Sequence, residues 1–107
     1  GEAMRTYLYI NDAVKFLWSI LLQGRQPIYN VGGIESTTIL NLAQRIGVIT
    51  GAKVVPGEKG GFSDAPRNVS LNMDKICDEF DYDIVDFTSL EEGLKKTIEW
   101  QKKNLYL

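Results

Sequence analysis

A helical segment that is too apolar to be buried on one side only places the strongest constraint on this chain. In residues 13–23, eight of the eleven residues are apolar. The apolar residues that recur at helical spacing, and so share one face, are Val14, Leu17, Trp18 and Leu21. The apolar surface extends beyond that face through Phe16, Ile20 and Leu22. Gly24 follows at the position where a left-handed residue ends a helix. A helix that is apolar on more than one side is buried on more than one side, so we expect packing partners on both.

Strand-like and helical patterns alternate along the rest of the chain. The expected strands are short and cover residues 5–10, 27–31 and 53–55, with another extended piece at 68–71. The later helices are expected from a cap at Ser36, Thr37 or Thr38 to Gly51, over 73–80, and over 90–104. This alternation indicates an α/β fold, or α+β in isolation, with about four helices in one domain over residues 1–107.

Side chains that accept hydrogen bonds from free backbone amides mark the helix starts. Asn11 or Asp12 is suited to cap the first helix, and Asn72 the third. Ser89 and Glu92 form an S-x-x-E capping box at the start of the last helix. Glutamate–lysine pairs four residues apart stabilise that helix further, at Glu91–Lys95, Glu92–Lys96 and Glu99–Lys103. The residues expected on its inner face are Leu90, Leu94, Ile98 and Trp100.

The composition excludes several classes of function. A net charge of −2 argues against a broad nucleic-acid surface, which would be basic. Cys77 is the only cysteine and histidine is absent, so the chain can form neither an internal disulfide nor a structural zinc site. No apolar run approaches the roughly 18 residues of a membrane span. These features predict a cytoplasmic protein that binds no metal.

Motifs for nucleotide binding and catalysis are also absent from the sequence. The single strand–glycine–helix junction is Val31-Gly32-Gly33-Ile34, which lacks the G-x-G-x-x-G spacing of a dinucleotide fold. No Gly-Lys pair is present for a phosphate loop, and no tyrosine has a lysine four residues later. A serine or cysteine nucleophile would lack a histidine partner. The chain therefore has no recognisable catalytic apparatus of its own.

Five segments, in order, resemble one family. Residues 1–14 are similar to its "G-x-x-x-R-x-[YF]-x-[YH]-[VI]-x-D" segment, and residues 28–33 to its "[YF]-N-[LIV]-G" strand. Residues 38–43 resemble the helix that follows, and Gly51 with Val54-Val55 resembles the next step. Residues 89–100, Ser-Leu-Glu-Glu-Gly-Leu-Lys-Lys-Thr-Ile-Glu-Trp, are close to the family's ending. The family is the NAD-dependent epimerase/dehydratase group of extended short-chain dehydrogenases.

The resemblance implies that this chain is the C-terminal, substrate-binding portion of an enzyme that acts on a nucleotide-diphosphate sugar. In the family, an N-terminal Rossmann domain carries the NAD or NADP loop and a Tyr-x-x-x-Lys pair. That domain is absent here, so we expect no catalysis by the chain alone and no cofactor bound to it. Family members transfer hydride to and from the nicotinamide, and the cofactor carries the difficult step. Epimerases, dehydratases and decarboxylases all belong to the group, and the sequence does not choose between them.

Three cations are candidates for contacting the diphosphate. Arg5 matches the family arginine with this role, and a guanidinium fork suits phosphate oxygens. Lys59 and Arg67 lie in or beside the loop that corresponds to the family's "R-x-G-D" loop, where Asp64 fits the aspartate but Gly61 stands near the expected arginine. The alternative for all three is an exposed, solvated side chain.

Residues 66–72 also resemble a stretch of sugar-nucleotide reductases of the same superfamily, with Ala65 where their arginine would be. A reductase is therefore an alternative to an epimerase or dehydratase. The sequence is also compatible with a stand-alone α/β interaction module without a ligand, or with a phosphate-binding module on loop 57–61. The phosphate-binding module is disfavoured because no helix start follows that loop.

The remaining conspicuous residues are expected to be structural. Tyr7 and Tyr9 are expected to be buried strand aromatics, and Cys77 a small buried side chain in a helix. Trp18 and Trp100 lie on apolar faces and are expected in the core. Gly32 and Gly33 are expected to form a tight turn. Because the first helix is apolar on two sides and one partner is missing, we expect a homodimer.

Overall fold

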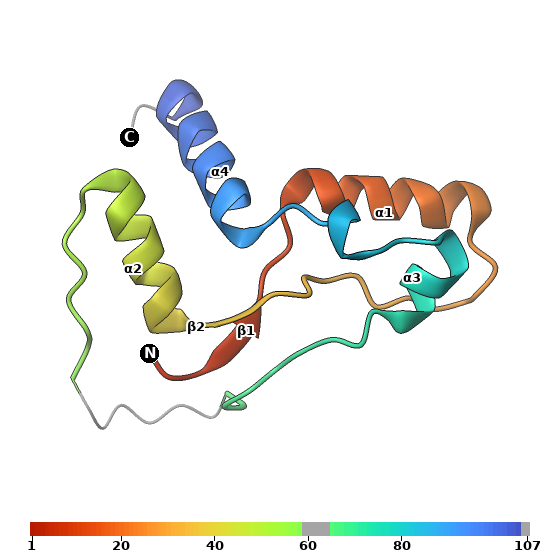
Figure 1. The fold of residues 1–107 in the computed structure, drawn as a ribbon, viewed down its shortest axis with the longest axis horizontal. Coiled ribbons are helices and arrows are strands. Elements are labelled where there is room, and N and C mark those ends of the chain that lie inside the picture. The colour runs from red at the N-terminus through yellow and green to blue at the C-terminus, as the bar shows by residue number, and fades with distance from the viewer. Residues whose placement is uncertain (59–64, 106–107) are drawn as a thin grey trace.

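The computed structural model describes residues 1–58 and 65–105. Figure 1 shows two groups of helices joined by a short antiparallel sheet. In chain order the elements are β1 (Met4–Thr6), α1 (Ile10–Gln23), β2 (Ser36–Thr38), α2 (Ile39–Thr50), α3 (Asp74–Phe80), the 3₁₀ helix η1 (Ile84–Asp86) and α4 (Leu90–Asn104). Helices α1 and α3 lie at one end with η1, and α2 and α4 lie at the other. The four α-helices and mixed architecture confirm the predicted fold class.

Strand β1 is bordered on both edges. On one edge it pairs antiparallel with β2, in the register Met4↔Thr38 and Thr6↔Ser36. On the other edge Met4 forms a parallel bridge with Asn68, through Met4 N–H to the Arg67 carbonyl at 2.9 Å and Val69 N–H to the Met4 carbonyl at 3.1 Å. The first residues of the chain therefore hold two distant segments in place.

The core is small and lies between α1, α3 and the residues after them. Its buried centre is formed by Phe16 of α1, Ile76 of α3 and Met73, which directly precedes α3. The Phe16 ring lies 5.0 Å from that of Tyr82 and 5.1 Å from that of Phe87, in the tilted arrangement that aromatic pairs favour. This cluster fixes α1 against α3 and η1.

The chain is more extended than a self-contained domain of its length. Its radius of gyration is 16.2 Å, whereas about 13 Å is typical of a compact domain of this size. One face of α1 is buried in the core, and the opposite face exposes a continuous set of large apolar side chains. These are Ile10, Val14, Leu17, Trp18, Leu21 and Leu22. We call this set the outer face of α1.

The N-caps of α2 and α4 match the sequence predictions, although only the Ser89 half of the predicted capping box forms and the Glu92 carboxylate pairs with Lys96. Thr38 is the N-cap of α2, where its side chain accepts from Asn41 N–H, and Gly51 ends the helix at φ 79°. Ser89 caps α4 by accepting from Glu92 N–H. The three predicted Glu–Lys pairs of α4 all form, at 2.9, 2.9 and 3.2 Å. Local signals therefore decide where these helices begin and end.

The start of α1 differs from the prediction. The strand ends at Thr6, the helix begins at Ile10, and its N-cap residue Tyr9 makes no side-chain capping bond. Asp12, predicted as a cap, lies inside the helix and is buried. Its carboxylate accepts from Thr88 N–H at 2.6 Å and from the Thr88 hydroxyl at 3.0 Å. Asp12 is thus committed to a distant residue and cannot serve its own helix end.

Two predicted strands do not form. Residues 27–31 and 53–55 carry no strand assignment in the structure. Tyr29 and Val31 pack against the core cluster, so the apolar character of the first segment is satisfied by side-chain packing. A strand also requires a neighbouring strand to complete its backbone hydrogen bonds, and among the described residues none lies beside either segment. Strand-like composition alone is therefore not sufficient to form a strand here.

Both tryptophans are exposed, contrary to the prediction. Trp18 is 57% exposed and belongs to the outer face of α1, and Trp100 of α4 is 58% exposed. Apolar periodicity identifies which side chains share a face but does not show that the face is covered. No helix among the described residues is long and apolar enough to cross a membrane.

Gly33 is buried, and close packing rather than the predicted tight turn requires a glycine at this position. Its φ is not positive, since among the described residues only Gly51 and Asp81 have positive φ. A Cβ on Gly33 would lie 2.0 Å from the Tyr7 carbonyl oxygen, and one on Gly32 would lie 2.7 Å from a Leu71 methyl. Gly33 therefore allows the backbone of residues 31–34 to lie directly against the link between β1 and α1.

Candidate functional site

Arg5 lies on β1, and its guanidinium faces backbone carbonyls. Nη1 donates to the Met4 carbonyl at 2.7 Å and to the Arg67 carbonyl at 3.2 Å, and Nη2 donates to the Pro66 carbonyl at 2.7 Å. The side chain is half-buried. The structure therefore brings Arg5 and Arg67 together, although they are far apart in the sequence.

Arg67 presents its side chain to solvent. One guanidinium nitrogen lies 3.4 Å from a Glu2 carboxylate oxygen, and the two side chains are 77% and 86% exposed. An exposed pair of this kind is worth at most about 1 kcal/mol, so the arginine can exchange it for a stronger anion. The third predicted cation, Lys59, lies outside the described residues, as do Asp64 and Gly61.

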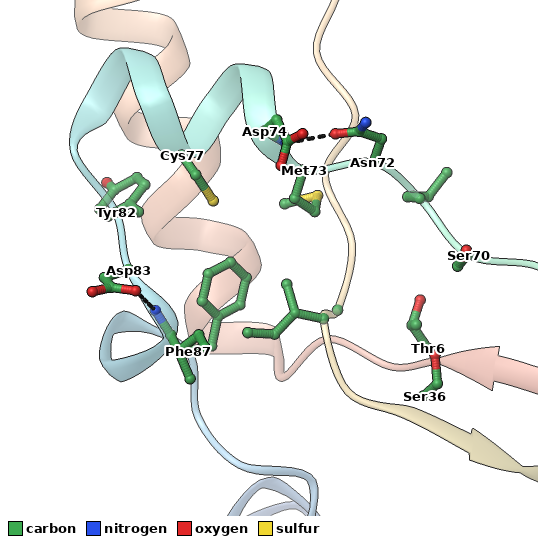
Figure 2. Close-up of a pocket in the computed structure, with 14 residues that line it drawn as sticks. Thr6, Ser36, Ser70, Asn72, Met73, Asp74, Cys77, Tyr82, Asp83 and Phe87 are labelled. Carbon is green, nitrogen blue, oxygen red and sulfur yellow. Dashed lines mark hydrogen bonds between the residues drawn. The ribbon is translucent and has the colours of Figure 1, made fainter.

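One cleft is lined by residues of β1 and β2 but by neither of these arginines. It has a volume of about 510 Å³ and opens between β1, β2, the segment before α3, α3 and η1. Figure 2 shows Thr6 and Ser36 at one end and Cys77, Tyr82 and Asp83 at the other. Because successive side chains of a strand point to opposite faces, Arg5 leaves β1 on the face opposite Thr6. The cleft and the arginine pair are therefore separate features.

The cleft suits uncharged ligands better than phosphate. Its lining offers hydroxyl groups, one amide, the Cys77 thiol and two carboxylates, but the described lining residues include no cation. Part of this polar character is already used locally. Asn72 Oδ1 accepts from Asp74 N–H at 2.8 Å and Asp83 Oδ1 from Ile84 N–H at 2.7 Å, each at a helix start. The predicted cap Asn72 lies one residue before the N-cap Met73, which makes no side-chain capping bond, but Asn72 does bind the first amide of α3.

Cys77 is half-buried and points from α3 toward the cleft (Figure 2). Burial raises the pKa of the thiol, and the neighbouring carboxylates of Asp74 and Asp78 raise it further. The thiolate is the nucleophilic form of cysteine, so this environment opposes nucleophilic chemistry. The prediction that Cys77 is a structural side chain rather than a nucleophile agrees with these surroundings, although its burial is only partial.

Tyr7 and Tyr9 do not alternate along a strand with Arg5, because β1 ends at Thr6. Tyr7 is partly exposed, at 38%. The Tyr9 ring packs against α4, where the Tyr9 Cβ lies 3.3 Å from the position of a Cβ on Gly93, and Lys96 Nζ lies 5.8 Å from the ring centroid. Tyr9 is therefore a packing residue, as predicted, but it belongs to a helix interface and not to a sheet.

Two carboxylates that the sequence did not reveal hold the start of α4. Asp12 binds Thr88, and Glu35 accepts from Leu90 N–H at 3.1 Å while lying 3.5 Å from Arg45 of α2. Negative charge at a helix N-terminus is stabilising. These contacts attach α4 to α1 and to the segment before β2. In a sequence, an acidic residue near the start of a helix is interpreted as a local cap. Its partners in distant segments therefore cannot be predicted from that position alone.

No protein-family model matches the sequence. Curated proteins do match it at low identity. The chain is 27% identical over 104 residues to a dTDP-4-dehydro-6-deoxy-D-allose reductase of Streptomyces bikiniensis, covering 94% of this chain and 30% of the relative. It is 24% identical over 120 residues to a probable dTDP-glucose 4,6-dehydratase of Sinorhizobium fredii, covering 97% and 32% respectively.

Solved structures agree with these matches. A dTDP-glucose 4,6-dehydratase of Bacillus anthracis in complex with NAD has a TM-score of 0.77 and 26% identity, over 99% of this chain and 33% of that one. In sequence and fold, the chain is similar to the C-terminal third of NAD-dependent epimerase/dehydratase proteins. WbmF of Bordetella bronchiseptica, in complex with NAD+ and UDP, has a TM-score of 0.74 and 28% identity, over 99% of this chain and 32% of that one.

The chain spans only about a third of the length of these relatives, and it corresponds to their C-terminal part. The predicted family is thus confirmed in both sequence and fold.

The described residues do not fit the NAD of the family's cofactor domain. An NAD pyrophosphate site needs glycines that open toward free amides at a helix start. Here Gly32 and Gly33 are packed against Leu71 and Tyr7. The first amides of α2 are also occupied: Ile39 N–H binds the Ala3 carbonyl at 3.1 Å, Leu40 N–H binds the Gly1 carbonyl at 2.9 Å, and Asn41 N–H binds Thr38. Among the described residues there is likewise no cluster that could hold a metal ion.

Proposed function

We propose that these 107 residues form the C-terminal, nucleotide-sugar-binding part of a longer NAD- or NADP-dependent enzyme of the epimerase/dehydratase type. The observation that carries the proposal is that two arginines distant in sequence, Arg5 and Arg67, lie together in a fold that matches this part of the family over 99% of the chain. The test is a panel of nucleotide-sugars, with product analysis, on the longer enzyme. Conversion of none of them would contradict the proposal.

The proposed ligand contact is made by guanidinium groups to the diphosphate. Arg67 is exposed and weakly paired, so its planar set of donors is free to bind phosphate oxygens. Arg5 adds a second positive charge beside it, and Lys59 is the third proposed cation. In this proposal the cleft of Figure 2, which lacks cations among its described lining residues, does not receive the diphosphate.

The chemistry would be divided between two parts of the polypeptide. The cofactor, NAD or NADP, would be held by an N-terminal Rossmann domain and would carry out hydride transfer when bound. This chain would hold the nucleotide-sugar. Three of the curated relatives are sugar-nucleotide reductases, which favours a reductase as the second candidate outcome. We further propose that the protein works in the cytoplasm and that it forms a homodimer.

The isolated 107-residue chain is expected to show no turnover. Its described residues offer no cradle for NAD, and its sequence lacks the Tyr-x-x-x-Lys pair. Mixing it with NAD or NADH and dTDP-glucose or UDP-glucose should leave the cofactor absorbance unchanged. A sample without protein provides the blank. Turnover above that blank would show that the chain is catalytically complete and would refute its proposed role as a binding part.

Arg5→Ala in the longer enzyme is expected to weaken nucleotide-sugar binding about tenfold to a hundredfold, because hydrogen bonds to charged groups contribute about 1.5–3 kcal/mol. Affinity for NAD should be nearly unchanged. Calorimetric titration measures both constants. Arg25→Ala, at an exposed arginine beyond the end of α1, serves as the control with the same loss of charge. Equal affinity in the Arg5 variant and the control would show that Arg5 does not contribute to nucleotide-sugar binding.

A further inference from the structure

The donors of Arg5 are directed at protein rather than at solvent. Its guanidinium donates to three backbone carbonyls, those of Met4, Pro66 and Arg67. An arginine that binds phosphate directly uses the same planar set of donors. Direct contact with a ligand would therefore compete with the bonds that Arg5 already makes.

These carbonyls lie where the segment containing Arg67 joins the sheet. The Arg67 carbonyl accepts from both Met4 N–H and Arg5, and the Met4 carbonyl accepts from both Val69 N–H and Arg5. Proline has no N–H, so Pro66 cannot donate to a further bond with β1. The Arg5 guanidinium binds the Pro66 carbonyl instead and so extends the attachment of the segment by one residue.

Arg67 has the opposite character. Its backbone is fixed on both sides by β1 and Arg5, while its side chain is 77% exposed and has only a weak partner in Glu2. The two arginines of the candidate site therefore differ in role. The guanidinium of Arg5 contacts only protein, whereas that of Arg67 has donors available to a ligand.

We propose that Arg5 is a positioning residue, which fixes the backbone of Pro66 and Arg67 so that the Arg67 guanidinium meets the diphosphate. The role of Arg67 rests on the function proposed above. The role of Arg5 rests on its three carbonyl contacts and can be tested without any ligand.

Hydrogen exchange of the ligand-free chain tests the positioning role. Arg5→Lys keeps the charge but loses the fork that spans the carbonyls. The Met4 and Val69 amides, which join β1 to the segment, should then exchange at least about tenfold faster. Arg25→Lys is the matched control, and circular dichroism checks that the helices remain. Unchanged exchange at both amides in Arg5→Lys would overturn the proposal.

A double-mutant cycle tests whether Arg5 acts through Arg67. UDP and dTDP are the probes, and Arg67→Gln leaves intact the backbone carbonyl that Arg5 binds. We expect each single variant to weaken binding at least about tenfold, and Arg5→Lys to have no further effect in the Arg67→Gln background. Additive losses would show that Arg5 contacts the ligand directly. If the unmodified chain binds neither probe, the diphosphate role proposed for it fails, and the exchange result alone decides the role of Arg5.

Discussion

The isolated chain is expected to self-associate through the outer face of α1. Ile10, Val14, Leu17 and Leu21 recur at intervals of three and four residues, so they form one stripe along the helix, and Leu21 is 74% exposed. Contiguous apolar patches beyond a few hundred Å² are rare on stable monomers. A symmetric dimer that buries two such stripes against each other is the simplest way to remove them from water.

The outer face also carries no competing charge. The ionisable residues of α1 are Asp12 and Lys15, and both are engaged on the inner side. Asp12 binds Thr88, and Lys15 Nζ donates to the Asp86 carbonyl at 2.6 Å. The outer face is therefore uniformly uncharged, which favours contact with another apolar surface. In the longer enzyme we expect the cofactor-binding half to cover it, so the dimer of the isolated chain need not resemble the natural one.

Light scattering at several concentrations measures this association. We expect a mass about twice 12.0 kDa that falls toward 12.0 kDa on dilution. Leu17→Glu combined with Leu21→Glu should give the monomer at all concentrations, because it places two charges in the stripe. Gln44→Glu, at an exposed position of α2, is the control and should leave the mass unchanged. A mass of 12.0 kDa throughout for the unmodified chain would favour a stand-alone module that tolerates its exposed stripe.

Gly33→Ala is expected to destabilise the fold severely. The added methyl carbon would lie 2.0 Å from the Tyr7 carbonyl oxygen and 2.6 Å from its carbonyl carbon. Both are backbone atoms, so no side-chain rotation can relieve the clash. The segment containing Gly33 would have to move away from the link between β1 and α1. Overpacking typically costs about 1–3 kcal/mol, and we expect about 3 kcal/mol or more here because the obstacle is rigid.

Thermal unfolding followed by circular dichroism measures this effect. For a domain of this size, about 3 kcal/mol corresponds to a loss of more than about 10 °C in Tm. Gly57→Ala is the matched control, because no described atom lies within 4 Å of its added Cβ. The control should keep the original Tm. A Gly33→Ala variant that melts at the same temperature as the Gly57→Ala control would show that residues 31–34 do not lie against Tyr7.

The sequence predicts helix ends well where the signal is local. The hydroxyl of Thr38 and the left-handed Gly51 mark the ends of α2, and Ser89 marks the start of α4. Each of these signals acts within a few residues, so the rest of the fold does not alter it. The prediction of strands at 27–31 and 53–55 is wrong. Strand formation depends on a neighbouring strand, and local composition does not specify one.

The candidate site could be predicted only in part for a related reason. The resemblance brought Arg5 and Arg67 into one site, and in the structure they lie together. It could not show that the Arg5 guanidinium is bound to carbonyls, because backbone groups of a distant segment have no sequence signature. The same holds for Asp12, whose position near a helix start suggested a cap while its partner is Thr88.

The double pairing of β1 has a consequence for recombination between family members. Residues 1–6 bind 36–40 through the sheet and the first amides of α2, and they bind 66–69 through the Met4 bridge and Arg5. A chimera with a crossover between any two of these segments would pair β1 from one parent with a partner segment from the other parent. Crossover libraries should therefore inherit all three segments as one block, even though long stretches of unrelated chain separate them.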